Sequence, residues 1–441
     1  MPVNSMHARR LLSLLLLLAL GLPSLARAER PYIDISGATF RPYPLAIPRP
    51  LTASPDQGAA ADLLVERLRY DLDVSGLFQV LDPRSFLARP DEGMTALAIK
   101  FNDWANVGAE GLLKIQLSAE GEKLKVEARL FGVTRAEQLA EWTFEDRAAE
   151  VRSLAHRLAD AVVHYFTRER SIFDTRLTFI RKIDGKKQVW VSDWDGNGAR
   201  RVVGGELNLL PAWSPAGDGL LFTSYRDGDP DLYTATLDGK VKRLVGGDAM
   251  FTGGAYSPDG KKVAFTRIAD GNAEIYLTSS QGGKIERLTD AYGVDTSPSW
   301  SPDGQKIAFV SSRHGNPHIF VMNADGSGQK RITFQGNYNQ TPDWSPRGDV
   351  IAFTARDERN VFDLFTVNPD TGEIRRLTQD TGNNEEPSFS PNGRHIAFTS
   401  TRSGTPRIYI MNADGTGQRL LDLPAGSYYT PAWGPWTAKA D

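Results

Sequence analysis

The stretch that decides the fold is WSPDGQKIAF at residues 300–309, because close copies of it recur along the chain. The leading aromatic residues of successive copies are separated by steps of 43, 44, 44, 45 and 44 residues. They stand at Trp213, Tyr256, Trp300, Trp344, Phe389 and Trp433. Self-similarity at such a fixed period is typical of repeat proteins, in which similar units stack on one another.

Each repeat carries the signals of four short antiparallel strands. Residues 298–300 and 306–310 flank one Asp-Gly turn, residues 318–322 follow, and residues 330–333 come after a second Asp-Gly turn. Asp-Gly between apolar runs favours a hairpin, because glycine accepts the positive φ that tight turns need. Four strands in about 44 residues match one blade of a β-propeller. The apolar runs lack polar alternation, so we expect both faces of a blade to be buried, with the leading aromatic residue between blades.

The repeat count predicts how the ring closes. The chain holds six sets of the later three strands and six leading strands, but the two series are offset by one. The first set, at residues 177–203, has no leading strand before it, and the leading strand at residues 431–434 has no set behind it. We therefore expect a six-bladed propeller over residues 171–436, in which the C-terminal strand completes the first blade. Residues 437–441 form a tail.

The region before the repeats predicts a compact α/β domain over residues 51–168, with two helices packed on a small mixed sheet. Apolar residues at helical spacing at residues 61–72 and 154–165 indicate the helices, and Ser54 and Gln57 suggest a capping box for the first. Residues 29–50 contain five prolines, which favour an extended arm or an edge strand. The remaining strands are expected at residues 77–81, 112–117, 124–131 and 139–144.

Residues 1–28 have the pattern of a secretory signal peptide. Two arginines at 9–10 precede an apolar run at 11–22, which is too short to span a bilayer, and an A-x-A motif follows at 26–28. We expect cleavage after Ala28 and, for a bacterial protein, delivery to the periplasm. The chain contains no cysteine, which excludes disulfides and a lipidated cysteine at the cleavage site. A net charge of −3 without basic runs disfavours nucleic-acid binding, and no further apolar run predicts membrane insertion.

No catalytic motif accompanies these domains. The sequence has no G-x-S-x-G elbow, Walker loop or dinucleotide fingerprint, so we expect neither an enzyme nor a cofactor. His314 and His318 flank a Gly-Asn-Pro turn and are fewer than the ligands of a zinc site. Residues 193–198, DWDGNG, reproduce half of a calcium loop, but Gly204 stands where the bidentate glutamate belongs. We interpret this hairpin as a turn of the repeat and predict no metal site.

A binding site is expected at one mouth of the propeller channel. The connections from each blade to the inner strand of the next reach this mouth and differ most between repeats. They hold aromatic, amide and acidic side chains, which suit contact with a protein. The candidate contact residues are Asn208, Met250, Thr252, Asp295, Thr296, Asn339, Gln340, Thr341, Asn384, Glu385, Tyr428 and Tyr429.

The export signal, the α/β domain and six WSPDG-type blades together resemble the TolB family of periplasmic Tol–Pal components. The resemblance covers nearly all of residues 29–436. It includes IDISGATFRPYPLAIP (33–48), DWANVGAEGLLKIQL (103–117), FDTRLTFI (173–180) and NADGSGQKRIT (323–333). It implies a protein without known catalysis, whose propeller binds the lipoprotein Pal over the channel mouth and which supports outer-membrane integrity at cell division.

The resemblance also assigns roles to particular residues. Thr296 matches a threonine at the family's channel mouth, whereas Met250 stands near the place of a family contact histidine. The mature N-terminal arm, from Glu29 to about Ser36, is implied to bind the inner-membrane protein TolA, with other outer-membrane proteins as further partners. The arm residues are Glu29, Arg30, Tyr32, Ile33, Asp34 and Ile35.

Two other functions stay open on the residues alone. A hydrolase or lyase would require histidine, acidic or metal-ligating side chains gathered at the channel. A binder of carbohydrate or peptidoglycan fragments would use Tyr338, Tyr428 and Tyr429 with the nearby amides. The alternative to an adaptor is therefore a periplasmic propeller that binds or cleaves a peptide or glycan fragment.

Overall fold

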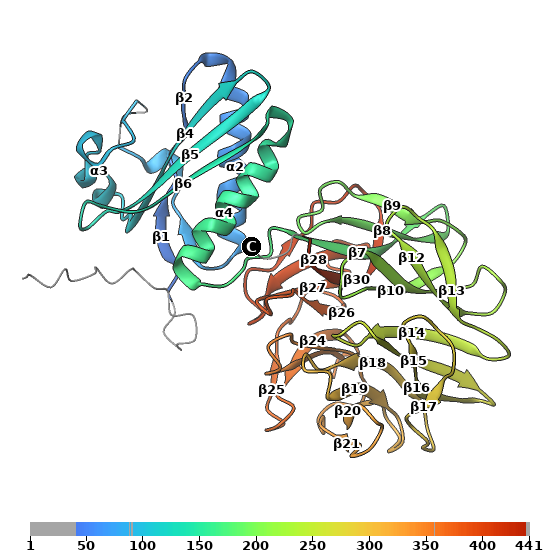
Figure 1. The fold of residues 1–441 in the computed structure, drawn as a ribbon. Helices are drawn as coiled ribbons and strands as arrows, with labels where there is room; N and C mark the ends of the chain where they lie inside the picture. Colours follow the sequence, from blue (N-terminus) through green and yellow to red (C-terminus); the bar gives the residue numbers. More distant parts are fainter. Residues whose placement is uncertain (1–40, 88, 90, 357, 438–441) are drawn as a thin grey trace, which may run out of the picture.

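The computed structural model describes residues 41–437, with the exception of residues 88, 90 and 357. Figure 1 shows an α/β domain beside a β-propeller. This arrangement confirms the predicted fold class. The expected signal peptide at 1–28 and the arm residues Glu29 to Ile35 lie outside the described residues.

The N-terminal domain packs two helices, α2 and α4, on a six-stranded mixed sheet with the order β3-β1-β4-β5-β6, in which β2 pairs with β4. Its core consists of two clusters of aliphatic and aromatic side chains, the larger of which joins both helices and the sheet and continues into the propeller. Its elements are β1 (Tyr43–Ala46), β2 (Leu51–Thr52), α2 (Gly58–Val74), β3 (Phe78–Val80), α3 (Phe101–Asn106), β4 (Gly111–Glu120), β5 (Lys123–Gly132), β6 (Glu137–Arg147) and α4 (Val151–Thr167).

Strand β1 differs from the expectation of an extended arm or edge strand, because it lies inside the sheet between β3 and β4. Pro44 is tolerated there for a simple reason. The backbone N–H of Tyr43 donates to Leu77 O at 2.9 Å, whereas Pro44 only accepts, from Glu110 N at 3.0 Å. A proline that is needed as an acceptor alone costs the ladder no donor.

The start of helix α2 also differs in detail from the predicted capping box. A 3-10 turn at Pro55–Gln57 precedes the helix, and the Ser54 side chain makes no capping bond. Gln57 reaches one residue further back than a capping box requires, since its Oε1 accepts from Ala53 N at 3.1 Å. Proline at the first position of the turn fits its fixed φ.

The propeller consists of six four-stranded sheets, and β30 pairs with β7 as the innermost strand of blade 1. The predicted closure by the C-terminal strand is thereby confirmed. Blade 1 contains β30 (Ser427–Trp436), β7 (Thr175–Ile183), β8 (Lys186–Asp193) and β9 (Arg200–Val203). Blades 2 and 3 contain β10 (Asn208–Trp213), β11 (Gly219–Ser224), β12 (Asp231–Thr236), β13 (Val241–Val245), β14 (Met250–Tyr256), β15 (Lys262–Ala269), β16 (Asn272–Ser279) and β17 (Glu286–Arg287). Blades 4 to 6 contain β18 (Asp295–Trp300), β19 (Lys306–Ser311), β20 (His318–Asn323), β21 (Lys330–Arg331), β22 (Asn339–Trp344), β23 (Ile351–Arg356), β24 (Phe362–Val367), β25 (Ile374–Arg376), β26 (Asn384–Phe389), β27 (His395–Ser400), β28 (Arg407–Asn412) and β29 (Arg419–Leu420).

The WSPDG motif holds neighbouring blades together. Five of its six leading aromatic residues are buried in clusters shared by two blades, as in the cluster of Trp300 with Ala264 and Ile275, and the sixth, Tyr256, is half-buried. Trp300 Nε1 also donates to Ala255 O in the preceding blade at 3.2 Å, and Trp213 Nε1 to Ala432 O at 3.2 Å. Because burying one large apolar side chain stabilises by about 1.5–3 kcal/mol, each of the five buried residues contributes substantially to the contact between its two blades.

The N-terminal domain packs against the end of the propeller that carries the SPDG turns. His395 Nε2 is 2.9 Å from Val74 O at the end of α2, and Glu169 contacts both Arg347 and Arg394. A second patch is formed by the hairpin at 193–198. Its Trp194 is fully buried against aromatic rings of the N-terminal domain and the linker: Tyr70, His156 and Phe173. Among the described residues, no helix is both long and apolar enough to cross a membrane.

Candidate functional site: the mouth of the propeller channel

The inner strand of every blade begins at the channel mouth. The chain runs down the inner strand, turns at SPDG, returns along the second strand, and repeats this course through the outer two. The mouth therefore collects the turns after the second strands and the connections into the next blade, whereas the N-terminal domain covers part of the opposite end. In Figure 1 that domain lies beside β27, β28 and β7.

A left-handed residue interrupts each inner strand just below the mouth. The ladder between inner and second strand shifts register there in all six blades. Positive φ values mark the shift at Leu210, Gly253, Ser297, Thr341, Glu386 and Thr430. Five of these residues are not glycine, so their backbone is strained, and strain of this kind is retained only where the surrounding structure enforces it.

The ordinary alternation of side chains along the inner strands, before the register shift, separates the candidate residues into two groups. Five point into the propeller and are buried: Asn208, Asp295, Asn339, Asn384 and Tyr428. They close hydrogen bonds between consecutive blades. Asn384 Nδ2, for example, donates to Asp363 Oδ1 of the preceding blade at 3.0 Å, and Tyr428 O–H donates to Pro424 O at 2.8 Å. These five side chains hold the mouth in shape and are not free for a partner.

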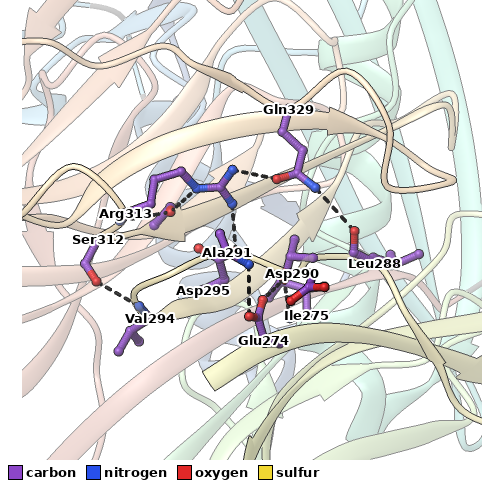
Figure 2. Close-up of polar contacts among 12 residues, drawn as sticks. Glu274, Ile275, Leu288, Asp290, Ala291, Val294, Asp295, Ser312, Arg313 and Gln329 are labelled. Carbon is purple, nitrogen blue, oxygen red and sulfur yellow. Dashed lines mark hydrogen bonds and ion pairs between the residues drawn. The ribbon is translucent and has the colours of Figure 1, made fainter. Parts of the chain in front are cut away.

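Figure 2 shows the best-developed of these junctions, between blades 3 and 4. Arg313 Nη2 donates to Asp295 Oδ2 at 2.7 Å, and its Nη1 donates to Gln329 Oε1 at 2.6 Å. Glu274 accepts from Ala291 N at 3.1 Å on the same connection. Burial raises the pKa of Asp295, although Ser311 and Arg313 oppose the shift. The junction is a structural ion pair at the place where the sequence predicted a contact residue.

The other seven candidates reach the channel or its rim. Met250 is 40% exposed, and the remaining six are half-buried: Thr252, Thr296, Gln340, Thr341, Glu385 and Tyr429. Thr341 Oγ1 lies 2.8 Å from Thr354 Oγ1, and Thr252 Oγ1 lies 3.3 Å from Thr223 Oγ1. A partner at the mouth would meet these seven side chains first.

Carboxylates line the channel on the side of blades 5 and 6. Burial, with a smaller contribution from the neighbouring Glu386, raises the pKa of Glu385 to about 7. Burial also raises the pKa of Glu386, whose Oε2 accepts from Thr399 Oγ1 at 2.7 Å and from Thr430 N at 2.7 Å. Deeper in the channel, burial raises the pKa of Asp343 to about 7. This wall therefore changes its charge near neutral pH.

The same face carries a set of exposed apolar residues of which only Met250 was among the residues expected from the sequence. Five large side chains are exposed there, from 39% at Tyr225 to 96% at Tyr292. The others are Met250, Val294 and Phe334. They belong to the turns and connections of blades 2 to 4, so the apolar sector lies beside the acidic one. In the sequence, these residues could have been recognised as aromatic or aliphatic side chains within polar, glycine-rich turns, where a large apolar residue is exposed.

Neither histidine nor the calcium-like hairpin forms a metal site in the described part of the chain, where no group of three or more potential ligands occurs. His318 is buried, and its ring contacts Arg331 and Asn339. Asp195 of the DWDGNG hairpin forms an ion pair with Arg152 of helix α4. The hairpin thus docks the two domains, a role that its turn pattern did not reveal.

Two family models match the chain. The model described as the TolB amino-terminal domain matches residues 31–139, and that described as the TolB beta propeller domain matches residues 163–437. The chain belongs to the TolB family.

Relatives and solved structures agree with this membership. The chain is 50% identical over 214 residues to the Tol-Pal system protein TolB of Myxococcus xanthus, covering 48% of this chain and 50% of that protein. It is 46% identical over 223 residues to that of Anaeromyxobacter dehalogenans, covering 50% and 51%. The chain spans about half the length of the curated TolB relatives it matches. The crystal structure of TolB from Acinetobacter baumannii has the same fold, with a TM-score of 0.78 and 24% identity over 92% of this chain and 99% of that one.

Proposed function

We propose that this protein is a non-enzymatic adaptor of a Tol–Pal system in the periplasm. Its propeller mouth binds the soluble domain of the lipoprotein Pal, and its mature N-terminal arm, Glu29 to about Ser36, binds TolA. Through these two partners it supports outer-membrane integrity and constriction at cell division. Membership of the TolB family and the names of the relatives support this assignment.

The observation that carries the proposal is the uneven distribution of apolar surface on the propeller. Of the described residues, five large exposed apolar side chains gather on the mouth face, whereas the opposite end is packed against the N-terminal domain. Contiguous apolar surface on a folded protein marks a contact with another molecule. The half-buried Thr252, Thr296 and Gln340 add the polar groups that an interface core needs at its edge.

The two partners would be coupled through the body of the protein. Pal and TolA bind at different places in this proposal, so any effect of one on the affinity of the other must be reciprocal. The interface between the domains, with its contacts at Glu169, Asp195 and His395, is the physical connection available for that coupling.

Calorimetric titration tests the assignment. The mature chain, Glu29 to Asp441, is titrated with the soluble domain of Pal from the same genome. We expect saturable binding that weakens at least about tenfold in Thr296→Arg, because the new side chain occupies the mouth. Gln305→Arg, in the exposed SPDG turn at the other end of the same blade, is the matched control and should bind as the wild type does.

Two results would contradict the proposal. Absence of binding between two folded proteins would remove Pal as the partner, and binding of muropeptides instead would favour the glycan-fragment alternative. Deletion of residues 29–36 tests the arm separately, since it should abolish binding of the TolA C-terminal domain without preventing binding of Pal.

A further inference from the structure

Each of blades 2 to 6 presents a pair of aromatic rings on one face, and three of these blades cover the pair with their own arginine. The ring centroids in each pair lie 5.7–6.2 Å apart. Arg226, Arg313 and Arg402 lie over the pairs of blades 2, 4 and 6, at 4.5–4.9 Å from the nearer centroid. Each of these arginines stands two residues after the serine that ends the second strand. A cation in this position is stabilised by the negative faces of the rings.

In blades 4 and 6 the first ladder residue of the inner strand supplies the acceptor for this arginine. Arg313 Nη2 donates to Asp295 Oδ2 at 2.7 Å, as Figure 2 shows, and Arg402 Nη2 donates to Asn384 Oδ1 at 2.8 Å. The guanidinium is therefore held from two sides, by the rings and by an oxygen atom. An arginine has five donors, so an acceptor in this position satisfies groups that would otherwise face a partly apolar surface.

Blade 3 lacks both features of this pattern, the arginine after the second strand and the acceptor on the inner strand. Its mouth hairpin is a two-residue turn, with Asp270 and Gly271 at φ of 53° and 80°, which leaves no loop to carry the usual arginine. Arg267 takes its place over Tyr276, at 5.6 Å from the ring centroid. The residue paired opposite Arg267 on the inner strand is Phe251, which offers no acceptor.

The guanidinium of Arg267 is therefore left without an acceptor. Within the described residues, no side chain or backbone oxygen accepts a hydrogen bond from it and no carboxylate forms an ion pair with it. Glu274, its neighbour across the strand pair, is already bound to Arg287 and Thr289, at 2.8 Å and 2.5 Å. Arg267 is only half-buried, so its donors are open to an incoming group.

A pocket of about 600 Å³ lies at this junction of blades 2 and 3. Arg267 and Arg243 line it together with Phe251, Tyr276 and Ile285. The side chain of Arg243 is 54% exposed, and its Nη1 makes a long contact of 3.4 Å with Asp231 Oδ2. Its other donors therefore stay available to a ligand. Asp248, which is exposed, is the acidic residue in the lining. The pocket thus combines two cationic groups with an apolar wall.

We propose that this pocket receives a carboxylate side chain, glutamate or aspartate, from the protein that binds the channel mouth. The partner's carboxylate accepts from Arg267 in the way that Asp295 accepts from Arg313 within the chain. Its methylene groups lie on Tyr276 and Ile285. The proposal rests on the proposed function, because it assigns the chemistry of one contact of that partner. The exposed Met250 precedes Phe251 of the pocket lining in the chain and is itself one of the mouth residues.

The experiment compares Arg267→Gln with Arg226→Gln in the mature chain. Arg226 occupies the equivalent place in blade 2, already has Ser224 Oγ as an acceptor at 3.3 Å, and serves as the matched control. Titration with the Pal domain should show about tenfold weaker binding for Arg267→Gln, a smaller salt dependence, and wild-type affinity for Arg226→Gln. Arg267→Lys keeps the charge and should recover part of the loss. Thermal unfolding verifies that each variant is folded.

A second probe separates failure of this inference from failure of the proposed function. The peptide acetyl-Gly-Glu-Phe-Gly-amide and its glutamine counterpart are titrated by NMR into wild type and Arg267→Gln. Preference for glutamate that disappears with Arg267 supports the pocket even where Pal does not bind. Binding of Pal that is unchanged by Arg267→Gln, or equal binding of the two peptides by the wild type, would overturn the inference.

Discussion

Asp343 shows how one channel residue can make the stability of the protein depend on pH. Its Oδ2 accepts from Phe389 N of the next blade at 2.7 Å. In blades 4 and 6 a serine does the same, since Ser299 Oγ accepts from Trp344 N and Ser388 Oγ from Trp433 N, both at 3.0 Å. Asp343 therefore accepts the same inter-blade hydrogen bond that a neutral serine hydroxyl accepts in blades 4 and 6. When it is ionised it also places a poorly solvated negative charge in the channel wall.

Replacing Asp343 by serine should stabilise the protein at alkaline pH. Burial raises the pKa of Asp343 from 3.8 to about 7, so its stabilising protonated form is lost as the pH rises through about 7. We expect Asp343→Ser to unfold like the wild type near pH 4 and to gain on the order of 1 kcal/mol by pH 8. Urea unfolding across that range measures the difference. Asp303→Asn, at an exposed turn where hydrogen bonds lower the pKa, should show no gain at pH 8.

The same residues show how far the sequence could predict the site. The period, the Asp-Gly turns and the offset between the strand series determined the blades and their closure, because these are local signals. The orientation of side chains at the mouth was not predictable. In blade 5 Asn339 and Gln340 alternate as in any strand, and the left-handed Thr341 that follows them shifts the register against β23. Only the three-dimensional ladder reveals that shift.

At the scale of the element, the outer strands of blades 3 to 5 end in a repeated Arg-x-Thr clamp around a residue near the start of the third strand. In blade 5, Asp363 accepts from Thr378 Oγ1 and Asn384 Nδ2, at 2.7 Å and 3.0 Å, and pairs with Arg376. In blade 4 the same place is taken by His318, with Arg331 Nη2 at 2.8 Å and Asn339 Nδ2 at 2.9 Å from its two ring nitrogens. A neutral imidazole has a single acceptor nitrogen, so it serves this clamp less well than a carboxylate.

His318→Asp should therefore stabilise blade 4. We expect a gain of about 1 kcal/mol at pH 7, because an aspartate accepts from all three donors at once. Burial lowers the pKa of His318 to about 4, so the wild type loses stability as the pH falls from 6.5 through 4, and the variant should lose less. Denaturant unfolding at pH 5 and pH 7 provides the measurement. The reverse exchange in blade 5, Asp363→His, should destabilise, and a stable Asp363→His variant would contradict the clamp.

At the scale of the whole molecule, the two domains share a hydrophobic cluster and the ion pair Asp73–Arg419, and two groups of contacts stand out. One is polar, around Glu169, Arg347 and Arg394 at the base of blades 5 and 6. The other surrounds the hairpin at 193–198, where the buried Trp194 lies against rings of the N-terminal domain and linker. Attachment at two places prevents rotation of one domain about either contact. The orientation of the N-terminal domain relative to the channel mouth is therefore fixed. A partner that shifted one domain would have to break one patch.

The ion pair between Asp195 and Arg152 is the contact that makes the hairpin a fixed point. The Asp195 side chain is 1% exposed and that of Arg152 is 20% exposed, so water compensates little for the loss of either partner. A double-mutant cycle with Asp195→Asn and Arg152→Met should give a coupling free energy of about 1–3 kcal/mol. The exposed pair Lys186–Glu206, within the propeller, should give less than about 0.5 kcal/mol in the same measurement. Calorimetry should also resolve two unfolding transitions in Asp195→Asn, because the domains then unfold with less dependence on each other. Equal coupling for the two pairs, with a single transition, would mean that the aromatic contacts of Trp194 alone dock the domains.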